Sequence, residues 1–259
     1  MTGDLDGRVA LITGAGRGIG AEIAAGLASR GARVAMLART ASQLDQVAAT
    51  VIAAGGTALA LTADLGDEGQ TVAALRRARS ELGEIELLIN NAAVVGPLAP
   101  TSALTRREIA DALAVNVLAP IYLSGRVLPA MLDEGWGRIV NVSSGVASRP
   151  EMMIRGTVYA TSKAALEAHT LNLSAELAGT GVTVNVYRPG AVDTEMQAWI
   201  RGQDPDRIGS ELHQRFMQSH AAGTLLTPQQ SAAALLAHLD SDATGQIWEA
   251  SGAPAAPQT

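Results

Sequence analysis

Apolar and polar positions alternate along the chain in blocks that are typical of strand–helix repeats. Short apolar runs bounded by glycine, proline or polar residues predict seven strands, at residues 9–12, 33–38, 57–62, 86–89, 138–142, 182–187 and 246–250. Longer segments with apolar residues at helical spacing predict helices at residues 21–30, 42–54, 67–82, 105–115, 117–132, 158–177 and 228–239. Strands that alternate with helices form parallel βαβ units with right-handed crossovers. The pattern therefore predicts an α/β fold, a doubly wound seven-stranded parallel sheet with helices on both faces.

The same pattern predicts one domain. No Pro-, Gly- or Ser-rich linker divides the sequence, and it has no internal repeat beyond the strand–helix alternation, so residues 1–259 are expected to form a single unit. Two of the helices are expected to meet at Asn116. Residues 191–223 are polar and irregular, with amphipathic pieces at 196–200 and 211–217.

Charge and composition narrow the class of protein. The formal net charge is −6 and the pI is about 5.2, which argues against nucleic acid as a partner. Without cysteine, disulfides and thiolate chemistry are excluded. Residues 1–8 lack the apolar core of a signal peptide, and no apolar segment free of charge and glycine approaches membrane-spanning length. We expect a soluble cytoplasmic protein.

The first strand runs into a glycine-rich turn, residues 13–20 (TGAGRGIG), and a helix follows directly. This is the context of a phosphate site, because glycine leaves no Cβ between backbone and ligand and the amides of a helix N-terminus attract anions. Gly14, Gly18 and Gly20 have the spacing T-G-x-x-x-G-x-G rather than G-x-G-x-x-G. An ordinary βα turn is the alternative, but the flanking strand and helix favour a dinucleotide.

Tyr159 and Lys163 lie four residues apart in a predicted helix, so their side chains share one face. A free phenol titrates near pH ~10, too high for a proton relay at neutral pH. A neighbouring ammonium favours the phenolate and lowers the phenol pKa, so Tyr159 could then exchange a proton with a carbonyl or alcohol oxygen. A surface pair on a helix is the alternative.

Other polar residues stand where predicted strands end. Ser143 and Ser144 follow the fifth strand, and residues 90–92 (NNA) end the fourth. Each has an ordinary alternative, as a turn-forming serine or a helix cap. Parallel strands end at one edge of the sheet, however, and that edge is where α/β folds place ligands. Together these residues predict a site there.

These motifs resemble the short-chain dehydrogenase/reductase family, whose order and spacing they follow. The matching positions span most of the chain and are residues 13–20, Asp64, residues 90–92, Asn116, Ser144, Tyr159, Lys163, Pro189, Gly190, Thr194 and, for the last strand, residues 245–252. The family usually has Asn-Asn-Ala-Gly at the fourth strand, and Ala93 replaces that glycine here. This departure could shift the loop beside the cofactor slightly.

The resemblance implies a Rossmann-like fold and a role for each matching residue. Tyr159 would be the catalytic acid/base and Ser144 would orient the substrate oxygen. Lys163 would hold the nicotinamide ribose and lower the Tyr159 pKa, and Asn116 would position a water in the proton relay. Asp64 would contact the adenine, while Pro189, Gly190 and Thr194 would lie at the nicotinamide end. The residues expected to contact the cofactor are Gly14, Arg17, Gly18, Ile19, Gly20, Arg39, Asp64, Leu65, Asn91, Ala92, Tyr159, Lys163, Pro189, Gly190, Val192 and Thr194. No metal site is expected.

The end of the second strand bears on the choice between NAD(H) and NADP(H). NAD preference needs a carboxylate there to bind the ribose 2′-hydroxyl, and the sequence instead reads Leu37-Ala38-Arg39. Arg39 and Arg17 could pair with a 2′-phosphate. Two solvated surface arginines are the alternative. We expect NADP(H) to be preferred over NAD(H).

Residues 191–223 occupy the position of the family's substrate lid. Apolar residues that could wall a substrate pocket are Met196, Trp199, Ile200, Phe216 and Met217, with Met152, Met153 and Ile154 opposite. They could equally be local core under a long loop. If they form a wall, the pocket suits a mostly hydrophobic ketone or secondary alcohol. Arginines that could contact an acidic substrate are Arg155, Arg201 and Arg207.

Three functions are compatible with these features. The first is an NADP(H)-dependent oxidoreductase that acts on a carbonyl or secondary alcohol. The second is a reductase of 3-oxoacyl thioesters, and the third is a non-catalytic NADP(H)-binding sensor or scaffold, against which intact Ser144, Tyr159 and Lys163 argue.

The helices at 117–132 and 158–177 carry apolar residues on more than one face. The resemblance adds that family members commonly pair these helices into tetramers or dimers, and a homotetramer is expected.

Overall fold

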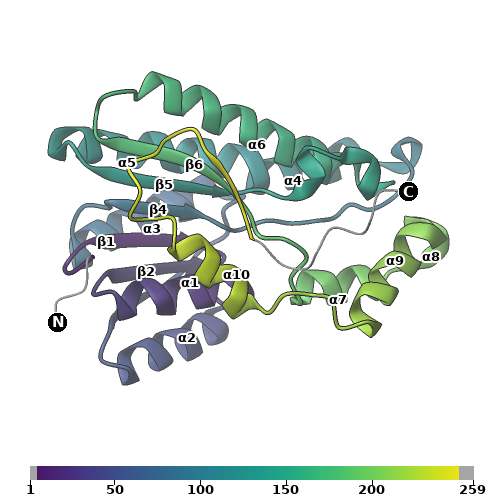
Figure 1. Cartoon of the computed structure of the whole chain (residues 1–259), viewed down its shortest axis with the longest axis horizontal. Helices are drawn as coiled ribbons and strands as arrows, with labels where there is room; N and C mark the ends of the chain where they lie inside the picture. The colour runs from purple at the N-terminus through teal and green to yellow at the C-terminus, as the bar shows by residue number, and fades with distance from the viewer. Residues whose placement is uncertain (1–4, 251–259) are drawn as a thin grey trace.

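The computed structural model describes residues 5–250 and is built around one seven-stranded sheet (Figure 1). All its strands run parallel, in the order β3-β2-β1-β4-β5-β6-β7. The strands are β1 Val9–Thr13, β2 Arg33–Ala38, β3 Thr57–Thr62, β4 Leu87–Asn90, β5 Gly137–Val142, β6 Val182–Arg188 and β7 Ile247–Glu249. The order reverses between β1 and β4, which is where doubly wound folds bind ligands. The predicted fold class is confirmed.

Helices cover both faces of the sheet (Figure 1). The α-helices are α1 Gly18–Ser29, α2 Ala41–Ala53, α3 Glu68–Leu82, α4 Arg106–Leu113, α5 Ala119–Glu134, α6 Thr157–Glu176, α7 Glu195–Arg201, α8 Pro205–Ile208, α9 Ser210–Ala221 and α10 Pro228–Leu236. Shorter 3₁₀ turns are η1 Thr101–Ala103, η3 Gly145–Ala147 and η4 Pro150–Met153, and η2 Ala114–Leu118 is a π-helix. The capping box of Thr105 and Glu108 fixes the start of α4.

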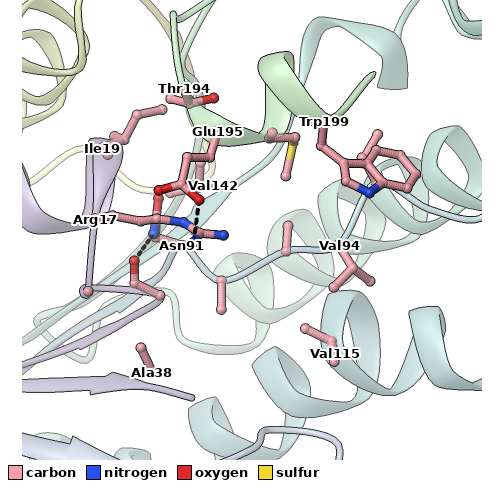
Figure 2. Close-up of a pocket in the computed structure, with 18 of the residues that line it drawn as sticks. Arg17, Ile19, Ala38, Asn91, Val94, Val115, Val142, Thr194, Glu195 and Trp199 are labelled. Atoms are coloured by element: carbon pink, nitrogen blue, oxygen red, sulfur yellow. Dashed lines mark hydrogen bonds and ion pairs between the residues drawn. The ribbon is translucent and has the colours of Figure 1, made fainter. Parts of the chain in front are cut away.

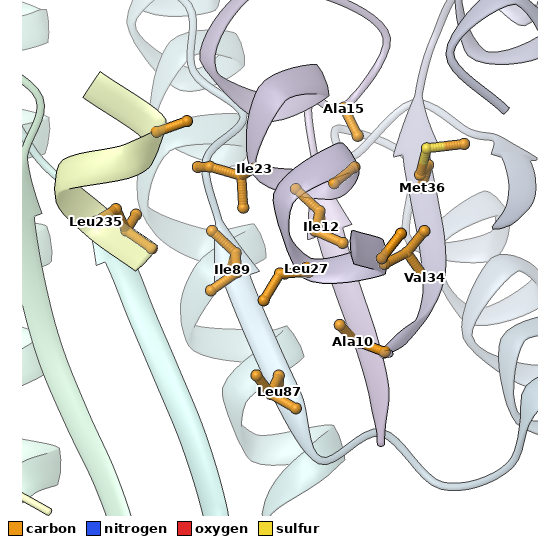
Figure 3. Packing of buried hydrophobic residues seen from close by; sticks show 14 of the residues in the cluster. Ala10, Ile12, Ala15, Ile23, Leu27, Val34, Met36, Leu87, Ile89 and Leu235 are labelled. Atoms are coloured by element: carbon orange, nitrogen blue, oxygen red, sulfur yellow. The ribbon is translucent and has the colours of Figure 1, made fainter. Parts of the chain in front are cut away.

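The core forms two layers because successive residues of a strand point to opposite faces. Ala10 and Ile12 of β1 pack with Ile23 and Leu27 of α1 and with Leu235 of α10 (Figure 3). The intervening residues of β1 face the opposite layer, whose buried members include Leu11, Leu88, Leu123, Val127 and Leu173. The central strands β1 and β4 are buried on both faces, which is why they read as nearly continuous apolar runs.

The predicted break at Asn116 is wrong. The helix runs without interruption from Arg106 to Glu134, and Asn116 lies in its π-helical segment. Single π turns inside α-helices are frequent at functional sites. Among residues 5–250 this is the one helix long and apolar enough to cross a membrane by length and composition, and Leu123 and Val127 are buried against the sheet, as in the core helix of a globular fold.

The segment 191–223 is more regular than predicted. It folds into α7, α8 and α9, which lie beyond the edge of the sheet (Figure 1). The amphipathic pieces 196–200 and 211–217 are confirmed as parts of α7 and α9. The Asp204 side chain accepts a hydrogen bond from the Asp206 N–H and starts α8. Residues 251 and 252, expected to continue the last strand, lie outside the described residues.

Candidate active site

The glycine turn packs tightly against the end of β4. Gly14 has a φ of 67°, and a Cβ there would lie 2.9 Å from the Ala92 Cα. A Cβ on Gly20 would lie 2.4 Å from the Gly14 carbonyl oxygen. The Asn91 side-chain Nδ2 donates to the Thr13 carbonyl at 2.9 Å, and the Thr13 hydroxyl accepts from the Asn91 and Ala92 amides at 3.0 Å. The turn therefore holds the N-terminus of α1 open toward the adjacent groove.

A groove of about 880 Å³ runs along the carboxyl ends of the strands, with Ala38 and Trp199 at its opposite ends (Figure 2). Most residues predicted to contact the cofactor line it, namely Gly14, Arg17, Gly18, Ile19, Gly20, Arg39, Asp64, Leu65, Asn91, Ala92, Tyr159, Lys163, Pro189 and Thr194. Gly190 packs on Leu226 instead, and Val192 is buried beside Leu226. The length of the groove and its glycine cradle fit a dinucleotide.

Tyr159 and Lys163 line this groove, and Ser144 lies beside Tyr159. The Ser144 side chain lies close enough to the Tyr159 phenol to act on its pKa. The Lys163 ammonium lies 5.7 Å from the centre of the Tyr159 ring and donates to the Val142 carbonyl at 2.7 Å. Tyr159 and Lys163 are only 9% and 2% exposed. Ser144 caps η3 just after β5 ends. The strand end thus brings Ser144 to Tyr159 and Lys163, which share one face of α6.

Burial dominates the titration of this group. It raises the pKa of the Tyr159 phenol, and the Ser144 side chain acts in the opposite direction. Burial also lowers the pKa of Lys163 to about 8, against the attraction of the Glu167 carboxylate. The expected lowering of the Tyr159 pKa is therefore not seen in the protein alone. The unfavourable desolvation of the phenolate outweighs the favourable interactions that its neighbours provide.

Lys163 is also the one lysine of the chain, a feature that the motif search missed. The other 18 of the 19 basic residues are arginines. Guanidinium stays charged under all ordinary conditions, whereas an ammonium loses its proton readily when buried. A buried lysine with a strongly shifted pKa is a sign of tuned proton chemistry. A count of residue types would have shown that Lys163 is the one lysine.

Asn116 makes contacts different from those expected. Its side-chain Oδ1 accepts from the Val94 amide at 2.8 Å, and its Nδ2 donates to the Val94 carbonyl at 2.8 Å and to the Ser162 hydroxyl at 3.0 Å. The side chain thus ties the loop after β4 to α6, one turn from Tyr159. An amide oxygen has two lone pairs, so Oδ1 keeps one acceptor position beyond its bond from the Val94 amide.

The two arginines assigned to the 2′-phosphate differ in their partners. Arg17 pairs with Glu195 of α7 at 2.5 Å across the groove, where the two side chains point toward one another (Figure 2). Arg39 is exposed and forms no ion pair among residues 5–250. The sequence analysis missed Thr40 and Gln43, which line the groove beside Arg39 at the start of α2. Their place directly after the second strand was the available signal.

The apolar residues of the lid divide between the two expected roles. Met196 and Trp199 line the groove, and the Trp199 ring covers Gly96, where a Cβ would approach it to 3.2 Å. Ile200 and Met153 are buried core under the lid, with Phe216 packed against that core. Large apolar side chains left exposed are Met152, Ile154 and Met217.

The three arginines near the lid have separate surroundings. Arg155 has a φ of 63°, and its Nη1 donates to the carbonyls of Asp206 and Arg207, so it anchors α8. Arg207 is exposed and lies 3.8 Å from Glu108. Arg201 lines the groove with a side chain only 13% exposed, 3.6 Å from Asp193.

Comparison with known proteins identifies the class that this fold and site define. The sequence profile of the family described as short chain dehydrogenase matches residues 8–205. The chain therefore belongs to the short-chain dehydrogenase/reductase family of oxidoreductases.

Three of its relatives cover nearly all of the chain. The 7alpha-hydroxysteroid dehydrogenase of Escherichia coli K12 is 33% identical over 96% of this chain and 94% of its own length. The crystal structure of 3-ketoacyl-(acyl-carrier-protein) reductase from Brucella melitensis complexed with NADH is 28% identical, with a TM-score of 0.81, and covers 95% of this chain and 97% of that one. A blue fluorescent protein from a metagenomic library in complex with NADPH is 30% identical, with a TM-score of 0.81, over 96% and 98%.

Proposed function

We propose that this oxidoreductase transfers a hydride between NADP(H) and the carbon of a carbonyl or secondary alcohol, with Tyr159 as the acid/base. One observation carries the proposal. Tyr159, beside Ser144 and with its ring centre 5.7 Å from the Lys163 ammonium, lines a groove that the glycine turn also lines. A binding protein without turnover would need the groove but not a buried phenol and ammonium within it.

Each residue then has a step to perform. Bound NADP(H) supplies or accepts the hydride. Ser144 orients the substrate oxygen, and the Tyr159 hydroxyl donates its proton to that oxygen as negative charge develops on it during reduction. Lys163 holds the nicotinamide ribose and favours the phenolate that Tyr159 becomes. Asn116 fixes the Val94 loop to α6 and would position the water of the proton relay.

The proposed preference for NADP(H) rests on the end of β2. β2 ends at Ala38, and the exposed cation of Arg39 follows with Thr40 and Gln43 beside it and no carboxylate at that position. Among residues 5–250, Arg39 forms no ion pair. Because Arg17 is paired with Glu195, Arg39 is assigned the larger share of that contact. The similar structures hold NADPH in one case and NADH in the other.

We propose a mostly hydrophobic ketone or secondary alcohol as the substrate. Trp199, Met196, Val94 and Val95 line the lid end of the groove, and the relative from E. coli is named for activity on a hydroxysteroid. A screen with NADPH, followed at the nicotinamide absorbance, should give higher kcat/KM for hydrophobic ketones than for sugars. A clear preference for polyols would overturn the substrate class.

A 3-oxoacyl thioester reductase is the second candidate, favoured by similarity to the reductase from Brucella melitensis. An acyl thioester added to the same screen separates the two: a higher kcat/KM for the thioester than for any simple ketone supports the second candidate. No turnover of any carbonyl by the wild-type protein would instead support a sensor or scaffold.

A further inference from the structure

A buried ionic cluster lies one turn further along the face of α6 that carries Tyr159 and Lys163. Glu167 stands one turn after Lys163, and its carboxylate accepts two hydrogen bonds from Arg188, from Nε at 2.9 Å and from Nη2 at 2.8 Å. The Ser143 hydroxyl donates to the same carboxylate at 2.7 Å. The Glu167 and Arg188 side chains are 11% and 13% exposed. Two-point pairing of this kind fixes geometry as well as charge.

The cluster joins the three segments that carry the candidate site. Ser143 precedes Ser144 at the end of β5, Glu167 shares α6 with Lys163, and Arg188 ends β6 directly before Pro189. The Ser143 hydroxyl also lies 3.5 Å from the Lys163 carbonyl. Burying such a pair has a desolvation cost, so its presence calls for a role beyond stability.

We propose that Glu167 is a positioning residue, which with Arg188 and Ser143 holds Ser144, Lys163 and Pro189 in register and supplies the negative charge that keeps the Lys163 side chain an ammonium. The use of that ammonium in turnover rests on the proposed function. The charge relation between Glu167 and Lys163 does not.

The sign of the effect follows from the charges around Lys163. The Glu167 carboxylate favours the ammonium and raises its pKa, against the lowering by burial. The Arg188 guanidinium, one contact further away, opposes the ammonium. Glu249 of β7 lies beyond Arg188, and the other charged or titratable groups that line the groove are Tyr159, Arg17, Arg39, Asp64, Asp193, Glu195 and Arg201. The end of β5 and η2 contribute only neutral groups, Ser143, Ser144 and Asn116.

The lone lysine makes a direct test possible. Protein labelled with ¹³C at the lysine ε-carbon gives one side-chain signal, from Lys163, whose shift reports its protonation without any substrate. We expect a wild-type midpoint near pH 8. Glu167→Gln should lower the midpoint by about one unit, the lower range for loss of a nearby opposite charge. Arg188→Gln should raise it, because Glu167 then faces Lys163 without its counter-ion.

Two further variants make the result decisive. Glu249→Gln removes the outer partner of Arg188. The Glu249 side chain is 62% exposed, so solvent screens its charge, and the variant should leave the Lys163 midpoint within about 0.3 pH units of wild type. The double variant Glu167→Gln, Arg188→Gln should move the midpoint back toward the wild-type value.

An unchanged midpoint in a folded Glu167→Gln protein would overturn the proposal and leave Glu167 a structural residue. Should that variant not fold, Arg188→Gln decides, since a midpoint that falls or stays would contradict the assigned charge relation. Shifted midpoints in a protein that reduces no carbonyl would instead reject the proposed function and retain the link between Glu167 and Lys163.

Discussion

At the scale of single residues, Lys163 shows how function and stability pull apart. A buried ammonium whose pKa falls from an ordinary lysine value to about 8 is disfavoured in the folded protein. Lys163→Met should therefore raise the free energy of unfolding at pH 7 by about 1–3 kcal/mol, while removing activity. Denaturant unfolding measures the gain.

The pH dependence of that gain has a fixed sign. The penalty on wild type is fully present below the folded pKa of about 8 and is relieved as the pH rises toward the unfolded lysine value near 10.4. The advantage of Lys163→Met should thus shrink between pH 8 and 10. A Lys163→Met variant less stable than wild type at pH 7 would show that burial does not destabilise the Lys163 ammonium in this way.

Arg39 carries the proposed cofactor preference. We expect NADPH to bind at least about tenfold more tightly than NADH, the equivalent of one strong charge-assisted contact. Arg39→Asp should narrow or reverse the ratio, because a carboxylate repels the 2′-phosphate and accepts from a 2′-hydroxyl. Fluorescence titration with both cofactors measures it. Equal affinities of the wild-type protein for NADPH and NADH would refute the preference.

The juxtaposition of Tyr159 and Lys163 was predictable from their spacing, whereas their proposed catalytic roles came from the family resemblance. Residues four positions apart on a helix share a face, so the Tyr159 and Lys163 side chains lie close together. Their protonation was not predictable, since burial rather than the neighbouring charge decides the direction of the Tyr159 pKa. The contacts of Asn116 and the pairing of Arg17 with Glu195 depend on segments distant in sequence, which no local pattern reveals.

At the scale of elements, β2 and β3 match their predicted ranges and the other strands agree at their centres. Strands buried on both faces read as apolar runs whatever surrounds them. Of the lid helices, α7 and α9 were anticipated as amphipathic pieces, whereas α8 was missed because so short a helix depends on its cap. The π segment was missed because apolar spacing does not distinguish i→i+4 from i→i+5 hydrogen bonds.

The glycine turn is the element most sensitive to a single methyl group. Gly20→Ala would place a Cβ against the Gly14 carbonyl and Asn91 Nδ2, at 2.4 and 2.5 Å. We expect a loss of about 1–3 kcal/mol in stability and weaker NADPH binding, because the turn must open.

Gly125→Ala on α5 is the matched control, since a Cβ there meets nothing within 4 Å. It should stabilise the protein by about 0.5–1 kcal/mol, the ordinary helix preference for alanine over glycine. Thermal unfolding and NADPH titration compare the two variants. Equal behaviour of the pair would mean that the turn is not closely packed.

At the scale of the whole molecule, the helices expected to pair leave large apolar side chains exposed. The helix that includes η2 and α5 leaves Leu118, Ile121 and Leu132 exposed, and α6 leaves Leu171 exposed. We propose that copies of the chain pair through these helices into a homotetramer. Light scattering should give four times the 26.5 kDa chain mass, and Leu118→Glu should lower it. A monomer mass for wild type would reject the assembly.

The account as a whole depends on the Tyr159 hydroxyl. Tyr159→Phe removes one oxygen from the groove and leaves the glycine turn, Arg39 and the lid in place. We expect NADPH affinity within about twofold of wild type, with kcat for the best ketone lowered by about a hundredfold or more, the usual contribution of a general acid. A Tyr159→Phe protein that binds NADPH and still reduces that ketone at the wild-type rate would contradict the account.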